Sequence, residues 1–284
     1  MEQPLCTMES DNTIAVCHPA ARWSDIQDVI KDHAKALPVM QASNIFSVGG
    51  SVSTNVHGWN PQSGTLSNHI AAITYMDENG DEHTANPGDE MFQNIVGGFG
   101  RHAVITSVKL RVIDNTKVQL KGKKMNLSSY FEHFKENILP KEDGLHIGRL
   151  PIDKINKWGD DDCMLISSDW EASHDNNPVA DKTLIREKKN GPMHMRILLN
   201  LMTHFPFMKK LYWKLEEAAD CGENPEMTLN ETMNFPIEAM MRNPEGARNY
   251  WLYEAFIDDE PTHEKIQRFT EQLGKILDKN KVNL

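Results

Sequence analysis

The sequence has no long apolar run and an excess of negative charge. None of its 284 residues falls in an uninterrupted apolar stretch of about 18 residues, the length that a transmembrane helix requires. Its start, Met1 to Pro4, lacks the basic segment and apolar core of a secretory signal. Lysine and arginine number 30 against 41 aspartate and glutamate, so the formal net charge is −11. A general nucleic-acid-binding protein needs a basic face, so this class is excluded, and a cytoplasmic protein is expected.

Cysteine is scarce, and its spacing does not suit a metal. The four cysteines are Cys6, Cys17, Cys163 and Cys221. They form no C-x-x-C pair, which is typical of a reducing compartment and excludes a zinc ribbon.

The 12 histidines are dispersed without an H-E-x-x-H motif, and the acidic runs 77–82 and 160–162 lack the spacing of a calcium loop. A P-loop and a G-x-S-x-G nucleophile elbow are also absent from the sequence. We therefore predict no metal site.

The apolar patterns alternate between helical and strand periods, which predicts an α+β fold. We expect strands over 13–17, 70–76, 103–113, 145–150, 163–170 and 251–257, and helices over 24–37, 89–96, 127–138, 193–217 and 262–277. Ser24 and Gln27 suit a capping box at the start of the first helix. Asn79-Gly80 is a hairpin signal. A boundary at Asp114-Asn115 would divide the chain into domains over 1–114 and 115–284.

One glycine motif suggests a dinucleotide site but has the wrong context. Gly98 to Ala103 fits G-x-G-x-x-A, which in a dinucleotide fold leaves a strand and opens a helix. Here the expected helix comes before the motif. The strand 103–113 follows it, with Val104, Val108 and Leu110 on one buried face. We therefore predict that this motif does not bind NAD(P).

The segment 193–217 is rich in methionine and aromatic residues. Core packing under a cap domain is the favoured interpretation of this predicted helix. Contact with a membrane surface is the alternative, because Lys209, Lys210 and Lys214 flank its apolar residues.

The segment 42–58 is poor in charge and rich in small residues. The adjacent glycines Gly49 and Gly50 allow a backbone to pass close to a flat or phosphorylated group. Helix amides after such a pair can hold a phosphate. A tight turn into a buried helix explains the same residues equally well, so the residues alone leave both interpretations open.

A family resemblance favours the first interpretation. Residues 48–58, Val-Gly-Gly-Ser-Val-Ser-Thr-Asn-Val-His-Gly, resemble the flavin-contacting segment of the vanillyl-alcohol oxidase / p-cresol methylhydroxylase superfamily. Members of this superfamily carry a PCMH-type FAD-binding domain. Segments similar to its later motifs follow in the family's order, at 64–70, 78–80, 90–92 and 97–106. The resemblance is strongest to sugar oxidases, such as aldono-lactone and decaprenylphosphoryl-ribose oxidases, and covers about residues 13–113.

The resemblance implies a function and a set of site residues. It implies an FAD-dependent oxidoreductase that oxidises an alcohol or sugar-like hydroxyl of a small molecule by hydride transfer to flavin. The implied FAD-binding residues are Ala42, Ser43, Ser47, Val48, Gly49, Gly50, Ser53, Thr54, Asn55, His57, Gly58, Val104 and Ile105. His57 is the implied catalytic residue, which would position a substrate hydroxyl or act as a general base.

The sequence also departs from the family pattern. Family members hold the FAD diphosphate with a glycine-rich loop in an N-terminal subdomain, whereas the first glycine here is Gly49. Ala103 stands where the family usually has glycine. The chain therefore resembles an oxidase that is truncated at its N-terminus and at its C-terminus. The alternative function is a catalytically silent remnant, or a subunit that needs a partner chain to supply the FAD loop.

Overall fold

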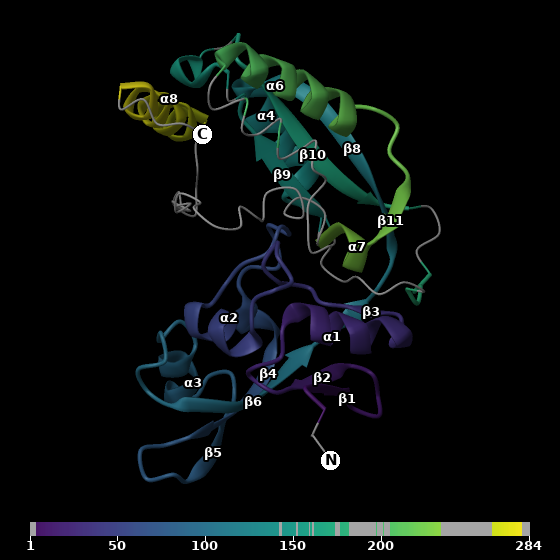
Figure 1. Ribbon diagram of the computed structural model, residues 1–284, viewed down its shortest axis with the longest axis vertical. Helices are drawn as coiled ribbons and strands as arrows, with labels where there is room; N and C mark the ends of the chain where they lie inside the picture. The colour runs from purple at the N-terminus through teal and green to yellow at the C-terminus, as the bar shows by residue number, and fades with distance from the viewer. Residues whose placement is uncertain are drawn as a thin grey trace.

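The computed structural model describes residues 4–141, 144–151, 153–158, 160, 162–173, 177–181, 197, 201, 205–233 and 263–279. These residues form two units, each built around an antiparallel sheet, which Figure 1 shows one above the other. The expected strand at 251–257 and the expected cap Thr262 lie outside the described residues. None of the described helices is long and apolar enough to cross a membrane.

The first unit is a five-stranded sheet covered by short helices. Its strand order is β1 (Cys6–Met8), β2 (Ile14–Cys17), β6 (Val104–Arg111), β4 (Ile70–Met76) and β5 (Glu82–Ala85). The helices are α1 (Trp23–Ile30), α2 (Val48–Thr54) and α3 (Glu90–Ile95), with 3-10 turns η1 (Lys31–His33) and η2 (Leu66–His69). The short strands β3 (Lys35–Ala36) and β7 (Ile113–Asp114) pair separately.

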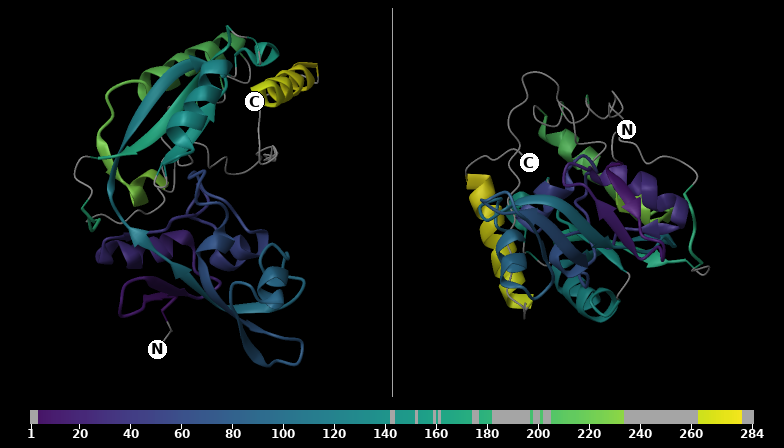
Figure 2. Two further views of the ribbon diagram at one scale, coloured as in Figure 1. Left: turned by 180° about the vertical axis from the view of Figure 1, so that it is seen from behind. Right: turned by 90° about the horizontal axis from the view of Figure 1, so that it is seen from below.

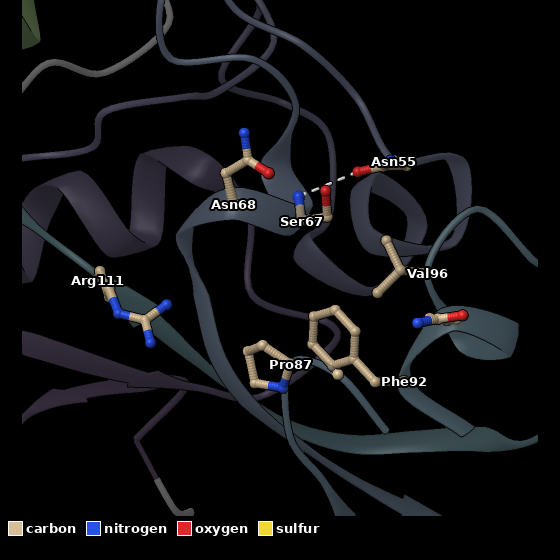
Figure 3. Close-up of a pocket in the computed structure, with 9 residues that line it drawn as sticks. Asn55, Ser67, Asn68, Pro87, Phe92, Val96 and Arg111 are labelled. Carbon is tan, nitrogen blue, oxygen red and sulfur yellow. Dashed lines mark hydrogen bonds between the residues drawn. The ribbon is translucent and has the colours of Figure 1, made fainter. Parts of the chain in front are cut away.

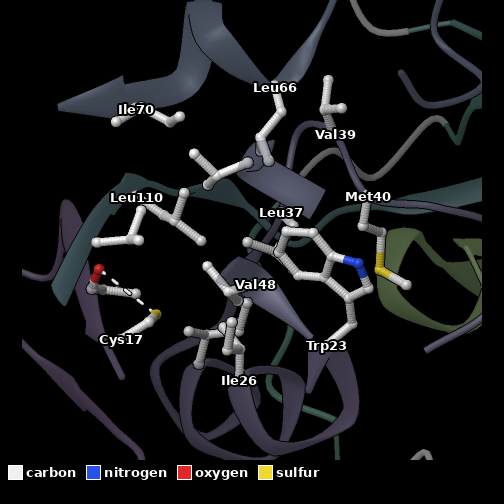
Figure 4. Packing of buried hydrophobic residues seen from close by; sticks show 14 of the residues in the cluster. Cys17, Trp23, Ile26, Leu37, Val39, Met40, Val48, Leu66, Ile70 and Leu110 are labelled. Carbon is white, nitrogen blue, oxygen red and sulfur yellow. Dashed lines mark hydrogen bonds between the residues drawn. The ribbon is translucent and has the colours of Figure 1, made fainter. Parts of the chain in front are cut away.

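The core of this unit lies between α1, α2 and the sheet. Trp23 and Ile26 from α1 meet Val48 from α2 and Leu110 from β6, as Figure 4 shows. All four side chains are buried. Burying such large apolar side chains stabilises the fold by about 1.5–3 kcal/mol each, so the unit is held mainly by apolar contact.

The predicted hairpin at Asn79-Gly80 is confirmed. Gly80 has a φ of 87°, a conformation that glycine adopts without strain, and it joins β4 to β5. The predicted helix at 89–96 and the strand at 70–76 are also confirmed.

The expected limits of the first helix were wrong at both ends. The helix α1 begins at Trp23, because Asp25 accepts a hydrogen bond from the Arg22 N–H at 2.9 Å. The Ser24 N–H donates to the Asn44 carbonyl, so Ser24 is not the cap. The helical turns end where Ala34 takes a left-handed conformation, before Pro38 is reached.

The buried face expected for strand 103–113 holds only at its C-terminal end. Val108 and Leu110 are buried as expected, whereas Val104 is 66% exposed. The cause is a β-bulge: Thr74 pairs with Ser107 and Tyr75 with Ile105, so Thr106 is an extra residue. One extra residue changes which face of the sheet the side chains on its N-terminal side occupy, and Val104 is one of them.

The second unit is a four-stranded sheet with helices packed against it. Its strand order is β11 (Glu226–Thr228), β8 (Lys117–Asn126), β10 (Met164–Ala172) and β9 (Leu145–Arg149). Its helices are α4 (Leu127–His133), continued by the π-turn η3 (Phe134–Ile138), then η4 (Ile155–Lys157), α6 (Pro206–Asp220), α7 (Leu229–Met233) and α8 (His263–Lys279). The helix predicted at 127–138 and the strands at 145–150 and 163–170 are confirmed, but β8 was missed.

Of the predicted helix 193–217, the structure describes 197, 201 and 205–217, and the expectation of core packing is wrong for several of these residues in α6. Phe207, Leu211 and Leu215 are exposed, while Trp213 is buried against the unit. The reason is that hydrogen-bonded polar side chains, and not the apolar stripe, face the sheet in this helix.

The two units meet along the loop that follows α2. The His146 N–H donates to the Trp59 carbonyl at 2.9 Å, and the rings of Trp59 and Trp170 lie 5.6 Å apart. Asn230 of α7 donates to the Lys35 carbonyl at 2.9 Å. In both views of Figure 2 α1 (purple) and α7 (light green) lie next to each other, and the Gln27 amide donates to the Asn230 carbonyl at 3.3 Å. Residues 57–62, which contain His57, are therefore beside the second unit.

Candidate functional site

The helix α2 starts with amides that are already satisfied. The Val48 N–H donates to the Ala21 carbonyl, and the Gly49 N–H donates to the Pro19 carbonyl, both at 2.8 Å. The Gly50 N–H makes a long contact of 3.4 Å with Ser47 Oγ. A phosphate at this helix start would need N–H groups that are free to donate. Of these three amides, only the Gly50 N–H makes a weak hydrogen bond that a phosphate could replace. The expected phosphate site on these amides is therefore not supported.

The two adjacent glycines have different surroundings. A Cβ at Gly49 would lie 2.9 Å from the Pro19 Cβ and 3.1 Å from its carbonyl oxygen, so Gly49 allows close packing within the chain. A Cβ at Gly50 would meet only Ser47 Oγ, at 3.2 Å. Gly50 is exposed, and its open side is available to a flat group. Close packing against Pro19 therefore accounts for Gly49. At Gly50 the space beside the backbone remains open to a ligand.

The hydroxyl groups on α2 donate to its own backbone. Ser53 Oγ donates to the Gly49 carbonyl at 2.8 Å, and Thr54 Oγ1 donates to the Gly50 carbonyl at 3.0 Å. Their protons are therefore committed, while their oxygens can still accept a hydrogen bond. These oxygens can accept hydrogen bonds from the hydroxyl groups of a sugar-like chain. They cannot bind a phosphate in the same way, because a phosphate offers only acceptors.

The end of α2 leads into the segment that carries His57. Asn55 has a φ of 48° and its Oδ1 accepts from the Ser67 N–H at 3.0 Å, which holds the following turn against η2. His57 is exposed, and its Nδ1 lies 3.0 Å from the Gly58 carbonyl oxygen. A backbone bridge to Thr65 fixes His57 at the junction side of the unit.

The second glycine motif docks onto α2. The Gly97 N–H donates to the Val52 carbonyl at 3.0 Å, and the Phe99 N–H donates to the Ser53 carbonyl at 2.9 Å. Phe99 is 71% exposed, and exposed Val104 follows at the start of β6. Residues 97–104, which are distant in sequence from α2, are thus brought beside its C-terminal half.

The predicted FAD-binding residues differ in accessibility. Ser43 and Val48 are buried; Ala42, Ser47, Gly49, Ser53, Asn55, Gly58 and Ile105 are half-buried; Gly50, Thr54, His57 and Val104 are exposed. Buried Ser43 lies in the segment whose Asn44 and Phe46 carbonyls accept from the first turn of α1. Its place is therefore structural, and the exposed members form the accessible part of the candidate site.

A pocket of about 440 Å³ lies on the first unit, between α3, η2 and the end of α2 (Figure 3). It is lined by Asn55, Ser67, Asn68, Pro87, Gly88, Phe92, Gln93, Val96 and Arg111. Only Asn55 belongs to the predicted FAD set. Arg111 donates to the Ile70 carbonyl at 2.7 Å, so its guanidinium is partly committed. This pocket does not gather the predicted site residues.

A buried polar cluster in the second unit was missed from the sequence. His146 Nδ1 and His133 Nε2 each lie 2.7 Å from a different oxygen of Asp169, and Ser167 Oγ donates to the same carboxylate at 3.0 Å. The Tyr130 hydroxyl lies 2.8 Å from His146 Nε2. The two histidines are 13 residues apart and come from α4 and β9, so no local spacing marks them. The sheet register, in which His146 faces Asp169, creates the cluster.

The electrostatics of this cluster fix its hydrogen bonds. Burial by itself would raise the pKa of Asp169, but hydrogen bonds from His146 and His133 outweigh burial and hold that pKa below its ordinary value. Asp169 is therefore a carboxylate and only accepts. His146 therefore donates from Nδ1 to this carboxylate, and its Nε2 pairs with the Tyr130 hydroxyl. Burial raises the pKa of Tyr130 above its ordinary value, so this hydroxyl keeps its proton.

A glycine makes room for Tyr130. A Cβ at Gly148 would lie 2.5 Å from the Tyr130 hydroxyl oxygen. Gly148 and His146 are on the same face of β9, two residues apart. The Tyr130 side chain therefore lies flat against the sheet, with its ring stacked on His146 at 5.6 Å.

Comparisons with known proteins identify the first unit. Residues 3–86 match the family described as "FAD binding domain". Alditol oxidase from Streptomyces sp. (strain IKD472 / FERM P-14339) is 29% identical over 89 residues, which are 31% of this chain and 21% of that protein. D-arabinono-1,4-lactone oxidase from Candida albicans (strain SC5314 / ATCC MYA-2876) is 22% identical over 242 residues, 84% of this chain and 40% of that protein.

The fold is also shared with a solved structure. Cholesterol oxidase from Brevibacterium sterolicum superposes with a TM-score of 0.57 at 14% identity, over 82% of this chain and 48% of that one. Its His121Ala mutant gives a TM-score of 0.56 at 15% identity, over 79% of this chain and 46% of that one. The chain spans less than half the length of each of these relatives. The predicted α+β class, the resemblance to PCMH-type FAD-dependent oxidoreductases and the cofactor FAD are confirmed to this extent: residues 3–86 match the FAD binding domain, and the chain is similar to these oxidases in sequence and fold.

Proposed function

We propose that this protein oxidises an alcohol or sugar-like hydroxyl of a small molecule, with FAD as the hydride acceptor. The observation that carries the proposal is the pair of backbone hydrogen bonds that hold the 97–99 turn against α2. The exposed residues near this contact are Gly50 and Thr54 on α2, Phe99 in the turn, and Val104 at the start of β6. A flat ring system suits these residues because Phe99 and Val104 are apolar and Gly50 has no side chain. The relatives named alditol oxidase and D-arabinono-1,4-lactone oxidase support the substrate class.

The residues of this chain then have distinct roles. FAD supplies the redox chemistry when it is bound. Gly50 and Val104 would contact it through backbone and apolar surface, and Asn55 would position the turn that leads to His57. His57 would hold the substrate hydroxyl or accept its proton. Its place beside the second unit suits a substrate bound between a flavin domain over 1–114 and a substrate domain over 115–284.

Flavin retention tests the proposed surface. Purified wild-type chain, incubated with FAD and then desalted, should keep a flavin absorption spectrum. Gly50→Val should lose it, because the added side chain occupies the open side of α2, and Gly50→Ala should weaken it. Gly50→Ala also restores helix propensity of up to about 1 kcal/mol, which offsets crowding at Ser47 Oγ. Equal melting temperatures with unequal flavin content would separate ligand contact from folding; wild-type flavin content in Gly50→Val would refute this site.

Substrate class is tested by anaerobic reduction. The FAD-loaded chain is mixed with an alditol, an aldono-lactone and a sterol, and the loss of flavin absorbance is followed. The proposal expects reduction by a sugar-like alcohol and a loss of at least about tenfold in rate with His57→Ala. His57→Gln keeps size and polarity without a titrating group, so it separates positioning from proton transfer. Reduction by none of the three compounds in a chain that retains FAD would contradict the proposal.

A second candidate is a flavin-binding subunit that depends on another chain. The observation in its favour is that Val48 and Gly49 already donate their N–H groups within the chain, so the start of α2 offers the FAD diphosphate almost no donors. A dianion needs several aimed N–H donors. Calorimetric titration of FAD into the purified chain decides between the candidates. Sub-micromolar binding by this chain alone favours the complete enzyme; binding only after addition of a family fragment with the glycine-rich loop favours the subunit.

A further inference from the structure

The helix α6 is attached to its sheet by its polar side chains. Arg149 of β9 donates to Glu216 Oε2 and to Asp220 Oδ2, both at 2.7 Å. Ser168 Oγ donates to the same Asp220 oxygen at 2.5 Å, and the Tyr212 hydroxyl donates to Glu216 Oε1 at 2.6 Å. An added Cβ at Gly122 of β8 would overlap the Asp220 carbonyl, so the glycine permits this close approach.

The opposite face of α6 is apolar and exposed. Phe207, Leu211 and Leu215 follow one another at intervals of four residues, so they lie on one helical stripe. Phe207 is 67% exposed and Leu215 is 52% exposed. Ile197, Leu201 and Phe205, just before the helix, are also exposed. A water-facing helix normally buries its apolar stripe and exposes its polar one. Here Trp213 is buried against the unit together with polar groups, while the stripe of Phe207, Leu211 and Leu215 stays exposed. A contiguous exposed apolar surface marks an interaction site.

The charge on this face is positive although the chain is acidic overall. Lys210 and Lys214 are exposed beside the apolar stripe, and Lys209 flanks it. Within the described part of the chain these lysines form no ion pair. The helix has three acidic residues, and all are paired: Glu216 and Asp220 with Arg149, and Glu217 with Lys124. The exposed face therefore combines aromatic and aliphatic side chains with unpaired lysines, in a chain of formal net charge −11.

We propose that this face, defined by Phe207, Lys210, Leu211, Lys214 and Leu215, docks the protein onto an anionic lipid surface. A helix that lies in the membrane interface buries its apolar side chains at the acyl boundary, while lysines bind the anionic headgroups. The charge favours lipid over a second copy of this chain, because a copy would bring the same lysines together. In Figure 1 α6 lies on the edge of the second unit that is remote from the first. Docking there leaves the junction near His57 accessible.

Co-sedimentation with vesicles tests the proposal on the full chain. Binding is measured to phosphatidylcholine vesicles with and without phosphatidylserine, at low and high salt. The proposal expects binding to the phosphatidylserine vesicles that salt weakens. The variant Phe207→Ser/Leu211→Ser/Leu215→Ser should lower the affinity at least about tenfold. The control Leu5→Ser/Met76→Ser/Ile113→Ser, which makes the same number of changes at exposed apolar residues of the first unit, should leave it unchanged.

The lysines are tested separately. Lys209→Gln/Lys210→Gln/Lys214→Gln should lose affinity by about fivefold for each lysine removed. The control Lys117→Gln/Lys141→Gln/Lys275→Gln makes the same change in net charge at lysines that are paired with glutamates, and should have little effect. Circular dichroism checks that all variants fold. Equal binding to neutral vesicles, or equal losses in both lysine sets, would overturn the proposal. Failure of the wild-type chain to bind any of the vesicles would also overturn the proposal. If light scattering then shows a dimer that the triple serine variant does not form, the face binds a second copy of the chain instead.

Discussion

Both units have an antiparallel sheet and buried apolar side chains, but the second unit also buries a charged cluster against its sheet. The first unit buries an apolar cluster in which Trp23, Ile26 and Val48 have no exposed surface. The second unit buries polar groups on consecutive positions of β10: Ser167 and Ser168 are fully buried and Asp169 nearly so. Apolar burial is non-directional and stabilises a fold in proportion to area, whereas buried charges must be paired to avoid a large desolvation cost.

This difference predicts different sensitivity to mutation. A substitution that shortens a buried apolar side chain should lower the stability of the first unit. In the second unit, a substitution that removes one partner of a buried hydrogen bond should do the same. The buried pairs of the second unit are not strong stabilisers in themselves, since much of their attraction offsets desolvation. They do fix the positions of the side chains that take part. The comparison therefore separates an apolar core from a buried polar cluster, which the second unit adds to its own buried apolar side chains such as Ile166 and Trp170.

The largest effect is expected at the centre of the apolar core. Trp23→Ala should destabilise the protein by about 4 kcal/mol, because it removes the largest buried side chain of the cluster and leaves a cavity. Urea unfolding followed by far-ultraviolet circular dichroism measures the loss. Phe99→Ala is the control, since its exposed ring should contribute less than about 0.5 kcal/mol. Equal effects of the two variants would refute the packing account of the first unit.

The next effect is expected at the buried carboxylate of the second unit. Asp169→Ala should cost about 3 kcal/mol, because His133 and His146 lose the acceptor for their buried N–H groups. The control Asp162→Ala, at an exposed carboxylate, should have little effect. A loss in Asp169→Ala no larger than in the control would show that the cluster contributes nothing to stability.

The same carboxylate gives this unit a pH dependence. The folded pKa of Asp169 is below its ordinary value of 3.8, so its contribution is present above the unfolded pKa and is lost as the pH falls through the folded one. Wild type should therefore lose stability more steeply than Asp169→Ala below about pH 4. Parallel acid-unfolding curves would contradict this assignment.

The first unit could be predicted from sequence in large part because its signals are local. The Asn79-Gly80 hairpin and the helix near 89–96 depend on neighbouring residues, and both were found. The residues assigned by family resemblance gather around α2 and the 97–99 turn, but their roles stay predictions. The bulge at Thr106 was not predictable, because it depends on how β4 pairs with β6.

The second unit was harder to predict because its signals are long-range. The strand β8 contains Lys121, Lys123 and Lys124, so its sequence resembles an exposed segment. It is a strand because it pairs with β10 over its length and with β11. Likewise, His146 and Asp169 look like surface residues in the sequence, and only the register of β9 on β10 buries them together.

A smaller effect is expected at the edge of the polar cluster. Tyr130→Phe removes one hydrogen bond to His146 while keeping the ring, and should cost about 1 kcal/mol. Gly148→Ala should cost more, since its Cβ would strike the rigid Tyr130 ring. A double-mutant cycle with Tyr130→Ala, Gly148→Ala and the variant that carries both changes tests this clash, which disappears when the ring is absent. The losses of the two single variants, measured by urea unfolding, should therefore sum to more than the loss of the double variant. Additive losses would show that Gly148 does not act by making room for Tyr130.

The last prediction is that NADH and NADPH do not bind at the glycine motif 98–103. It depends on the structural roles of the glycines in the two units. Gly122 and Gly148 in the second unit admit a neighbouring element, whereas Gly98 and Gly100 in the first unit form the turn between α3 and β6. An added Cβ at Gly98 would overlap the Asn94 carbonyl, so packing within the chain accounts for that glycine. A strand follows the motif, and no helix start is present there to receive a pyrophosphate. Titration with NADH and NADPH should therefore give no saturable fluorescence change. Tight binding that Gly100→Val abolishes, in a variant that still folds by circular dichroism, would instead make this turn a dinucleotide site.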